Sequence, residues 1–294
     1  MSIPKTESHA LAGLMTLSPA ELAQADAQRA AQQPQLLGLP LWTQGRDQLF
    51  EHLSERVQSQ PPDARPLELH SVNAEISVQV RGDEAYRQLL AHNPINIPDG
   101  EWVKRLAGFK YGRRFERISG SDLVSDLCRH AADQGWSVFL LGAAEDVSAK
   151  AAEVLTASLP NLELQRFSPP FEARPDVSPQ VTAQILEHLA AARPTVLIAC
   201  LGSPKQELWF RQHEQQLARL GVRLVMGAGG SLDFLAGRVH RAPRLVSNAG
   251  FEWLWRLAHQ PRSRFRRIAT RLPRFFALAL VDSITGRIKP AHKS

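Results

Sequence analysis

Residues 199–207 combine side chains and backbone that could bind an anionic ligand: they read A-C-L-G-S-P-K-Q-E. The apolar run 195–201 predicts a strand and a helical pattern follows it, so the turn between them would lie at a strand's carboxyl end. There Gly202 permits close backbone approach, Pro204 suits a first helical turn, and the helix start offers free N–H groups to an anion. Three side chains with different hydrogen-bonding chemistry complete the turn: Lys205, Gln206 and Glu207. They favour a ligand site over the alternative, an ordinary strand-to-helix connection.

Similar residues follow other predicted strands, namely Ser71 and Asn73, Asp99-Gly100, Gly142, and the glycine-rich run 227–230 that begins with Gly227. Because the carboxyl ends of parallel strands meet at one edge of a sheet, a single cleft could collect them. Each also has a structural alternative. Asn73 and Asp99 can cap helices, which spacing alone favours for Asp99, and the glycines can simply turn the chain.

Known cofactor and metal motifs are absent from the sequence. Residues 140–146 lack the G-x-G-x-x-G spacing of a dinucleotide site, and no Lys-Ser or Lys-Thr follows the glycines at 227–230. The ten histidines and two cysteines show neither metal-ligand spacing nor a disulfide framework. We therefore expect no cofactor, no metal and a reducing, cytoplasmic environment.

Apolar runs alternating with helical patterns from residue 67 onward predict a doubly wound, mostly parallel α/β sheet with a C-terminal helical appendage. Strands are expected at residues 67–72, 95–97, 137–141, 162–166, 195–201 and 223–226. Helices are expected at residues 47–58, 83–92, 100–109, 121–134, 146–158, 178–192, 204–220, 248–259 and 261–281, with Pro273 kinking or dividing the last. This pattern predicts an Ala/Gln-rich extension and linker at 1–62, a core at 63–237 and the appendage at 238–294.

The charge of this 294-residue chain is concentrated in the appendage. Residues 238–274 hold ten arginines, no lysine and one acid, so this segment carries a net charge of +9. Because the whole chain carries +6, the remaining residues carry −3. Apolar residues at Phe265, Ile268, Leu272, Phe275 and Phe276 form a stripe among these arginines. A basic amphipathic helix favours an anionic membrane surface, and docking in an oligomer is the open alternative. The sequence shows no secretory signal peptide and no run long enough to span a bilayer.

Four blocks in this order identify a resemblance: S-V-N at 71–73 with P-D-G at 98–100, R-I-S-G-S-D-L at 117–123, residues 202–207, and residues 233–257 with D-F-L-A-G, R-A-P and E-W-L-W-R-L. Over about residues 67–267 the chain resembles the WecG/TagA/CpsF glycosyltransferases, glycosyltransferase family 26. The resemblance implies a compact α/β fold whose C-terminal appendage helps to close the site. It also implies transfer of a hexose, often of the N-acetylmannosamine type, from a UDP donor to a polyprenyl-diphosphate-linked acceptor in cell-surface polysaccharide synthesis.

The resemblance also assigns residues. Asp99 matches the family's candidate base, Ser71 stands where most members have Thr, and Asn73, Gln206 and Asp233 match positions that line the pocket. Phe251, Gln260 and the F-S-P-P-F stretch at 167–171 depart from the family pattern, so the donor sugar stays open. The implied partners are the UDP-sugar, the lipid-linked acceptor and the inner face of the cytoplasmic membrane, where the protein would be peripheral; nucleic acid is not expected, and a homo-oligomer stays open.

The expected mechanism needs a base and compensation for the leaving diphosphate. Because the sequence lacks a D-x-D-type metal motif, we expect backbone N–H groups near Gly202 and Gly227 to provide the compensation without a metal. Arginines of the appendage would assist them: Arg238, Arg241, Arg256 and Arg262. The competing hypothesis, a non-catalytic module that binds anionic lipid or nucleic acid through the tail, does not require the polar residues at the strand ends.

Overall fold

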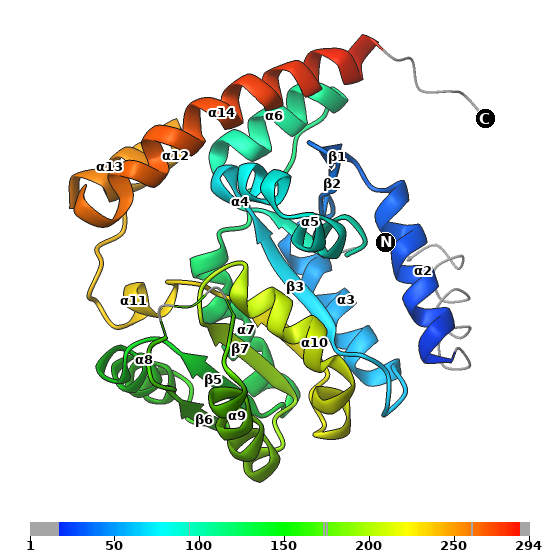
Figure 1. Cartoon of the computed structure of the whole chain (residues 1–294), viewed down its shortest axis with the longest axis vertical. Helices are drawn as coiled ribbons and strands as arrows, with labels where there is room; N and C mark the ends of the chain where they lie inside the picture. Colours follow the sequence, from blue (N-terminus) through cyan, green and yellow to red (C-terminus); the bar gives the residue numbers. More distant parts are fainter. Residues whose placement is uncertain (1–17, 94, 173, 175, 260, 289–294) are drawn as a thin grey trace.

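A six-stranded parallel sheet forms the centre of the computed structural model, which describes residues 18–93, 95–172, 174, 176–259 and 261–288 (Figure 1). The strand order is β4-β3-β8-β7-β5-β6, and every neighbouring pair is parallel. The strands are β3 (Leu67–Val72), β4 (Asn96–Pro98), β5 (Val138–Gly142), β6 (Leu164–Phe167), β7 (Val196–Cys200) and β8 (Leu224–Gly227). The predicted α/β fold with a parallel sheet is confirmed, and the strand ends differ from the predicted ones by at most two residues.

Helices cover both faces of the sheet, which explains why β5, β7 and β8 are buried along their whole length. One face packs against α3 (Arg46–Ser59), α7 (Gly120–Gln134) and α8 (Glu145–Ser158). The other face packs against α9 (Pro179–Ala192) and α10 (Lys205–Arg219). Alternate residues of each strand point to opposite faces, so that Leu140 joins the first core and Leu141 the second.

A third core lies beyond the β4 edge of the sheet. It joins α5 (Glu84–Ala91) and α6 (Glu101–Tyr111) to a short antiparallel hairpin of β1 (Gln35–Leu36) and β2 (Leu39–Pro40). The short helix α4 (Ala74–Gln79) and the 3-10 turn η2 (Val80–Gly82) complete it. The sequence analysis missed the hairpin and α4, because both are too short to show a period.

The segment before β3 packs closely against the sheet domain. Helix α3 contributes Leu49 and Leu53 to a core of the sheet, and α2 (Pro19–Gln32) is tied to α3 by the buried ion pair of Asp26 and Arg56, 2.7 Å apart. Residues 1–17 of the expected extension lie outside the described part. The domain boundaries at residues 62 and 237 stay predictions.

The C-terminal part contains α11 (Leu232–Leu235), α12 (Arg244–Ala249), α13 (Glu252–His259) and α14 (Pro261–Ile288). The helix predicted for 248–259 is present as α13, but its predicted start is four residues too early, because Gly250 with φ 88° ends α12 and separates it from α13. α14 runs through Pro273, so of the two predicted outcomes, a kink or a division, the division is wrong.

The long helix α14 lies across α4 and α6 (Figure 1). Its residues Phe275 and Ala279 are fully buried in the third core, and Asp282 pairs with Lys110 of α6 at 2.8 Å. This packing offsets the backbone hydrogen bond that Pro273 removes. Within the described residues, no helix is both long and apolar enough to cross a membrane.

Candidate active site

A cleft of about 870 Å³ opens at the carboxyl ends of β3, β4, β5, β7 and β8. Nine of the fourteen residues predicted from the sequence line it: Ser71, Asn73, Asp99, Gly202, Lys205, Gln206, Glu207, Gly227 and Asp233. Their segments are spread over more than 150 residues of chain, and the parallel sheet brings them to one edge. The predicted shared cleft is therefore present in the structure, while the role of each residue in it stays a prediction.

Ser71 and Asp99 lie together at one end of the cleft, beside the start of α7. The backbone N–H of Asp99 donates to the carbonyl of Val72, 3.0 Å away, which continues the β3–β4 pairing. At Gly120 a Cβ atom would collide with Ser71 Oγ and would lie 3.2 Å from Asp99 Oδ2. Gly120 thus lets the hydroxyl and the carboxylate approach the same point of the helix start. It belongs to a block that carries the family resemblance, but its role as a close-approach glycine was not predicted.

Helix capping was the structural alternative for Asn73 and Asp99, and the structure supports it for Asn73 alone as an N-cap residue. Asn73 Oδ1 accepts hydrogen bonds from the N–H groups of Glu75 and Ile76, both at 3.0 Å, so Asn73 caps α4 while it lines the cleft. In α6 the N-cap position belongs to Gly100 and not to Asp99. The capping position that spacing favoured for Asp99 is therefore wrong.

The turn after β7 is held by its own side chains. The N–H of Gly202 donates to Gln206 Oε1 at 3.2 Å, and Gln206 Nε2 donates to Glu207 Oε1 at 2.8 Å. Gln206 and Glu207 are only 2% and 3% exposed, so they form the floor of the cleft. Lys205 donates from Nζ to the carbonyl of Glu172 at 3.0 Å and ties the turn to the loop after β6.

Pro204 departs from the prediction by one position. It occupies the N-cap of α10, and the helix itself begins at Lys205, so the expected place in the first turn is wrong. Pro204 does not contribute to the cleft lining. Its ring, which lacks an N–H donor, suits a residue just before a helix start as well as one just inside it.

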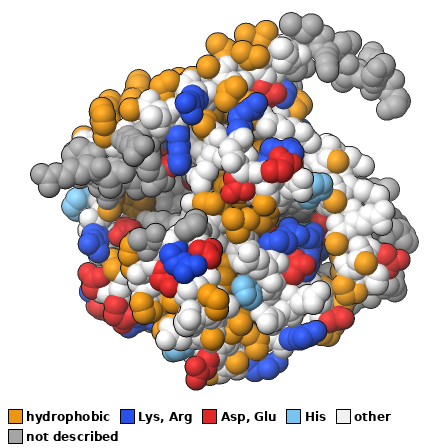
Figure 2. All heavy atoms as spheres, viewed as in Figure 1, with side chains coloured by type: hydrophobic (Ala, Val, Ile, Leu, Met, Phe, Trp, Pro, Cys, Tyr) orange, Lys and Arg blue, Asp and Glu red, His pale blue; other side chains and the backbone are white. Residues whose placement is uncertain are grey.

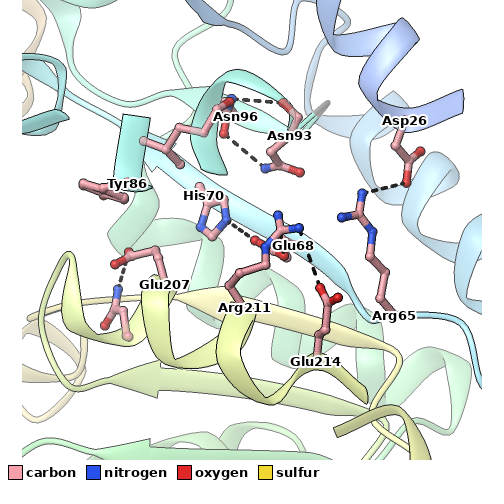
Figure 3. Close-up of polar contacts among 12 residues, drawn as sticks. Asp26, Arg65, Glu68, His70, Tyr86, Asn93, Asn96, Glu207, Arg211 and Glu214 are labelled. Carbon is pink, nitrogen blue, oxygen red and sulfur yellow. Dashed lines mark hydrogen bonds and ion pairs between the residues drawn. The ribbon is translucent and has the colours of Figure 1, made fainter. Parts of the chain in front are cut away.

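Two buried carboxyl groups at the base of the cleft, Glu207 and Glu68, have pKa values shifted in opposite directions. Figure 3 shows their positions. Burial raises the pKa of Glu207, and His70 and the amide of Gln206 oppose that shift without cancelling it. Burial also acts to raise the pKa of Glu68, but His70, 2.9 Å away, and Arg211, 3.2 Å away, lower it overall. The surroundings therefore hold the pKa of Glu68 below its ordinary value and the pKa of Glu207 above it.

The arginines predicted to bind the ligand do not gather at the cleft in the described part of the chain. Arg238 lies 3.8 Å from Asp146, and Arg241 pairs with Asp122; neither arginine lines the cleft. The side chains of Arg256 and Arg262 lie outside the described part. Sequence reasoning overlooked that the exposed acids nearby would compete for Arg238 and Arg241.

A different arginine reaches the cleft wall. Arg271 of α14 contacts Glu75 Oε1 at 2.5 Å and Gln79 Oε1 at 3.1 Å, and both partners line the cleft. The sequence placed Arg271 in the basic tail without assigning it a role. The contact joins α14 to α4 at the edge of the site.

A smaller cavity of about 160 Å³ adjoins the cleft at Asn73, Glu75 and Asp99. Its other walls come from α6, α12, α13 and α14, and they include the apolar side chains Trp102, Trp253, Ile268 and Leu272. Asp99 therefore lies between a large polar cleft and a small, more apolar one. The sequence analysis did not predict this second cavity, because it depends on how α14 crosses α4 and α6.

The loop after β6 forms another part of the cleft wall that was missed. Residues 168–172 line the cleft, and Phe171 is 93% exposed there. Cys200, at the end of β7, also lines it, and burial raises the pKa of its thiol to about 12, so it is a neutral thiol and a poor nucleophile. Among the described residues, no three His, Cys, Asp or Glu side chains are grouped so that they could hold a metal ion.

Comparison with known proteins gives one family match. Residues 34–289 match the family described as Glycosyl transferase WecG/TagA/CpsF. The matched region is wider than the resemblance seen in the motifs, which covered residues 67–267. It takes in the hairpin and α3 at one end and the whole of α14 at the other.

Proposed function

Since the chain belongs to the WecG/TagA/CpsF glycosyltransferase family and is therefore a glycosyltransferase, we propose that it transfers a hexose from a UDP-sugar to a polyprenyl-diphosphate-linked acceptor. The sugar would be of the N-acetylmannosamine type or a related one, and the product would serve cell-surface polysaccharide synthesis. The observation that carries this proposal is the cleft, in which Asp99 and the turn after β7 lie in one space of about 870 Å³. That volume suits a nucleotide-sized ligand.

Asp99 is the proposed general base. The acceptor hydroxyl oxygen would form a bond to the anomeric carbon of the donor while the bond from that carbon to the diphosphate breaks. The proton would pass to Asp99, and the electron pair would leave with UDP. Asp99 suits this role because it lines both cavities, so that an acceptor in the smaller cavity would meet a donor in the larger cleft at its carboxylate.

The leaving diphosphate needs positive charge or hydrogen-bond donors. We assign this to backbone N–H groups of the turn at Gly202 and of the loop after Gly227, together with Lys205, in a reaction without a metal. Arg256 and Arg262 remain proposed contributors, since α13 and α14 border the smaller cavity. The structure offers less support for Arg238 and Arg241, which pair with acids outside the cleft.

The acceptor's lipid chain requires the enzyme to work at a membrane, and we propose that α14 meets the cytoplasmic face of that membrane. Hydrophobic side chains lie along the outer edge where α14 runs (Figure 2). Exposed ones include Phe265, Leu280, Val281 and Ile284, whereas Phe275 and Ala279 face inward. Exposed apolar groups beside basic residues suit an anionic lipid surface. The other occupant of this face, a second copy of the chain, stays open.

The test is a screen of UDP-sugars for UDP release with a soluble polyprenyl-diphosphate-sugar mimic as acceptor. We expect release with one N-acetylhexosamine donor or a close relative, and we expect it to require the acceptor. Calorimetric titration with UDP alone separates donor binding from transfer. A protein that binds no UDP and releases none from any donor would exclude the proposed donor class, and the cleft would then have to serve another nucleotide.

A further inference from the structure

Glu207 is a buried carboxyl group on the floor of the cleft that the proposed reaction does not use. Its Oε1 accepts the hydrogen bond from Gln206, and among the described residues its Oε2 has no hydrogen-bond partner. The side chain lines the cleft but is only 3% exposed, so little of its surface is open to a ligand. Burying a carboxyl group is costly unless it is hydrogen-bonded, which makes its contact with Gln206 the interaction to explain.

The neighbour that matters is the amide of Gln206. Its Oε1 accepts from the Gly202 N–H while its Nε2 donates to Glu207, so the two contacts fix the orientation of the amide. A flipped amide would set donor against donor at Gly202 and oxygen against oxygen at Glu207. In the observed orientation, Nε2 keeps a second N–H that can donate to a ligand.

We propose that Glu207 is a positioning residue, which orients Gln206 and through it holds the Gly202 turn in the geometry that receives the donor's diphosphate. This inference rests on the proposed function of the cleft. Gly227 gives independent geometric support. A Cβ at that position would lie 2.5 Å from Gln206 Nε2 and 2.7 Å from Glu207 Oε1, so β8 ends in a residue that leaves room for both side chains.

Burial of Glu207 raises the pKa of its carboxyl group, and Oε1 accepts the hydrogen bond from Gln206 Nε2 at 2.8 Å. The titratable groups that interact with Glu207 are His70 from β3 and Tyr86 from α5, while Glu68 from β3 and Arg211 from α10 lie nearby and pair with each other (Figure 3). Glu68 pairs with Arg211 at 3.2 Å and with one nitrogen of His70 at 2.9 Å. Tyr86 donates to or accepts from Ser203 Oγ at 2.6 Å and encloses the same turn.

Two substitutions separate positioning from general stability. Glu207→Gln keeps a neutral side chain with an acceptor oxygen, whereas Glu207→Ala removes the acceptor and leaves a cavity. We expect Glu207→Ala to weaken UDP binding by about tenfold, as the loss of one buried hydrogen bond implies, and Glu207→Gln to stay within about threefold. The matched control is Asp26→Ala, which removes another buried carboxylate, between α2 and α3, and should lower the melting temperature without changing UDP affinity.

A second measurement does not depend on any ligand. Amide hydrogen exchange of the peptide that contains Gly202 should be faster in Glu207→Ala than in the wild type, and unchanged in Glu207→Gln and Asp26→Ala. Equal exchange and equal UDP affinity in the wild type and Glu207→Ala would overturn the proposal. If the wild type itself binds no UDP, the donor assignment fails, and the exchange experiment still decides whether Glu207 positions the turn.

Discussion

Replacing Gly120 by alanine tests the end of the cleft where Ser71 and Asp99 meet. In the interior of a helix this change is favourable by about 0.5–1 kcal/mol, which is the upper limit of the gain at Gly120, the first residue of α7. Here the added Cβ would collide with Ser71 Oγ and lie 3.2 Å from Asp99 Oδ2. Helix propensity and site geometry therefore predict opposite signs for the same substitution, which makes the result informative.

The collision should outweigh the gain. Overpacking by one methyl group costs about 1–3 kcal/mol, which leaves a net destabilisation of up to about 2.5 kcal/mol after the propensity gain. For a chain of this size, a loss of about 1–2 kcal/mol lowers the melting temperature by about 2–8 °C. Relief of the collision must shift Ser71 or α7 by a fraction of an ångström to about one ångström, and a misplacement of that size can reduce kcat by about 10–100-fold.

Unfolding and transfer assays on a double-mutant cycle check this reasoning. Ser71→Ala removes the Oγ atom that the new Cβ would meet, so the Gly120→Ala penalty should largely disappear in the Ser71→Ala background, with a coupling energy of about 1 kcal/mol or more. Gly82→Ala is the control, because a Cβ at Gly82 meets nothing within 4 Å. If Gly120→Ala is as stable and as active as the wild type, or if the two changes are additive, the close approach at the helix start is not required.

Four further outcomes are expected. Asp99→Asn should abolish transfer and leave UDP affinity within about threefold, since the amide keeps the shape and loses the basicity; turnover near the wild-type rate would mean that the base lies elsewhere. Gln206→Ala should strongly weaken UDP binding, measured by calorimetry, and lower the melting temperature only slightly. Unchanged UDP affinity with a lowered melting temperature would restore a purely structural role. The pKa of Glu207 is raised above 4.5 in the folded protein, so the folded state keeps this proton at pH values where the unfolded state has lost it. The unfolding free energy of the wild type, measured relative to Glu207→Gln, should therefore fall as the pH rises above about 4.5, by up to ~1.4 kcal/mol per pH unit until the folded pKa is passed. A difference in unfolding free energy that does not change with pH would contradict the raised pKa. Changing Val281 and Ile284 together to Asp should reduce sedimentation with anionic liposomes at low salt without lowering activity on a soluble acceptor, and unchanged sedimentation would turn attention to an oligomer interface on α14.

The strands and the shared cleft could be predicted because they follow from local rules. Runs such as residues 195–201 are apolar throughout, which is typical of strands buried on both faces, and parallel strands bring their carboxyl ends to one edge. Knowing the strands was therefore enough to expect Asp99, Gly202 and Gly227 near one another, whereas Asp233 was expected there only from the family resemblance. Boundaries of helices were also accessible where a capping residue such as Ser178 stands at the start.

The remaining features depend on packing that no local pattern contains. Pro273 is a helix breaker by itself, but the burial of Phe275 against α6 keeps α14 continuous. The orientation of long side chains was equally inaccessible, so Arg241 was expected at the cleft although it pairs with Asp122, and Arg271 was passed over although it contacts Glu75. Which of several arginines meets an acid is decided by tertiary contacts and not by sequence spacing.

The position of β8 in the sheet has a consequence for folding. β8 lies between β3 and β7, so it joins the first sheet strand of the chain to the strands formed by the middle of the sequence. Leu69 pairs with Met226, more than 150 residues later, and such long-range pairings make folding slow. On the ribosome, β3 and β4 would therefore wait, with one edge of β3 uncovered, until residues 224–227 emerge. The cleft would form only at that late step, and this makes the interval before β8 is inserted the time at which the nascent chain most needs protection from aggregation.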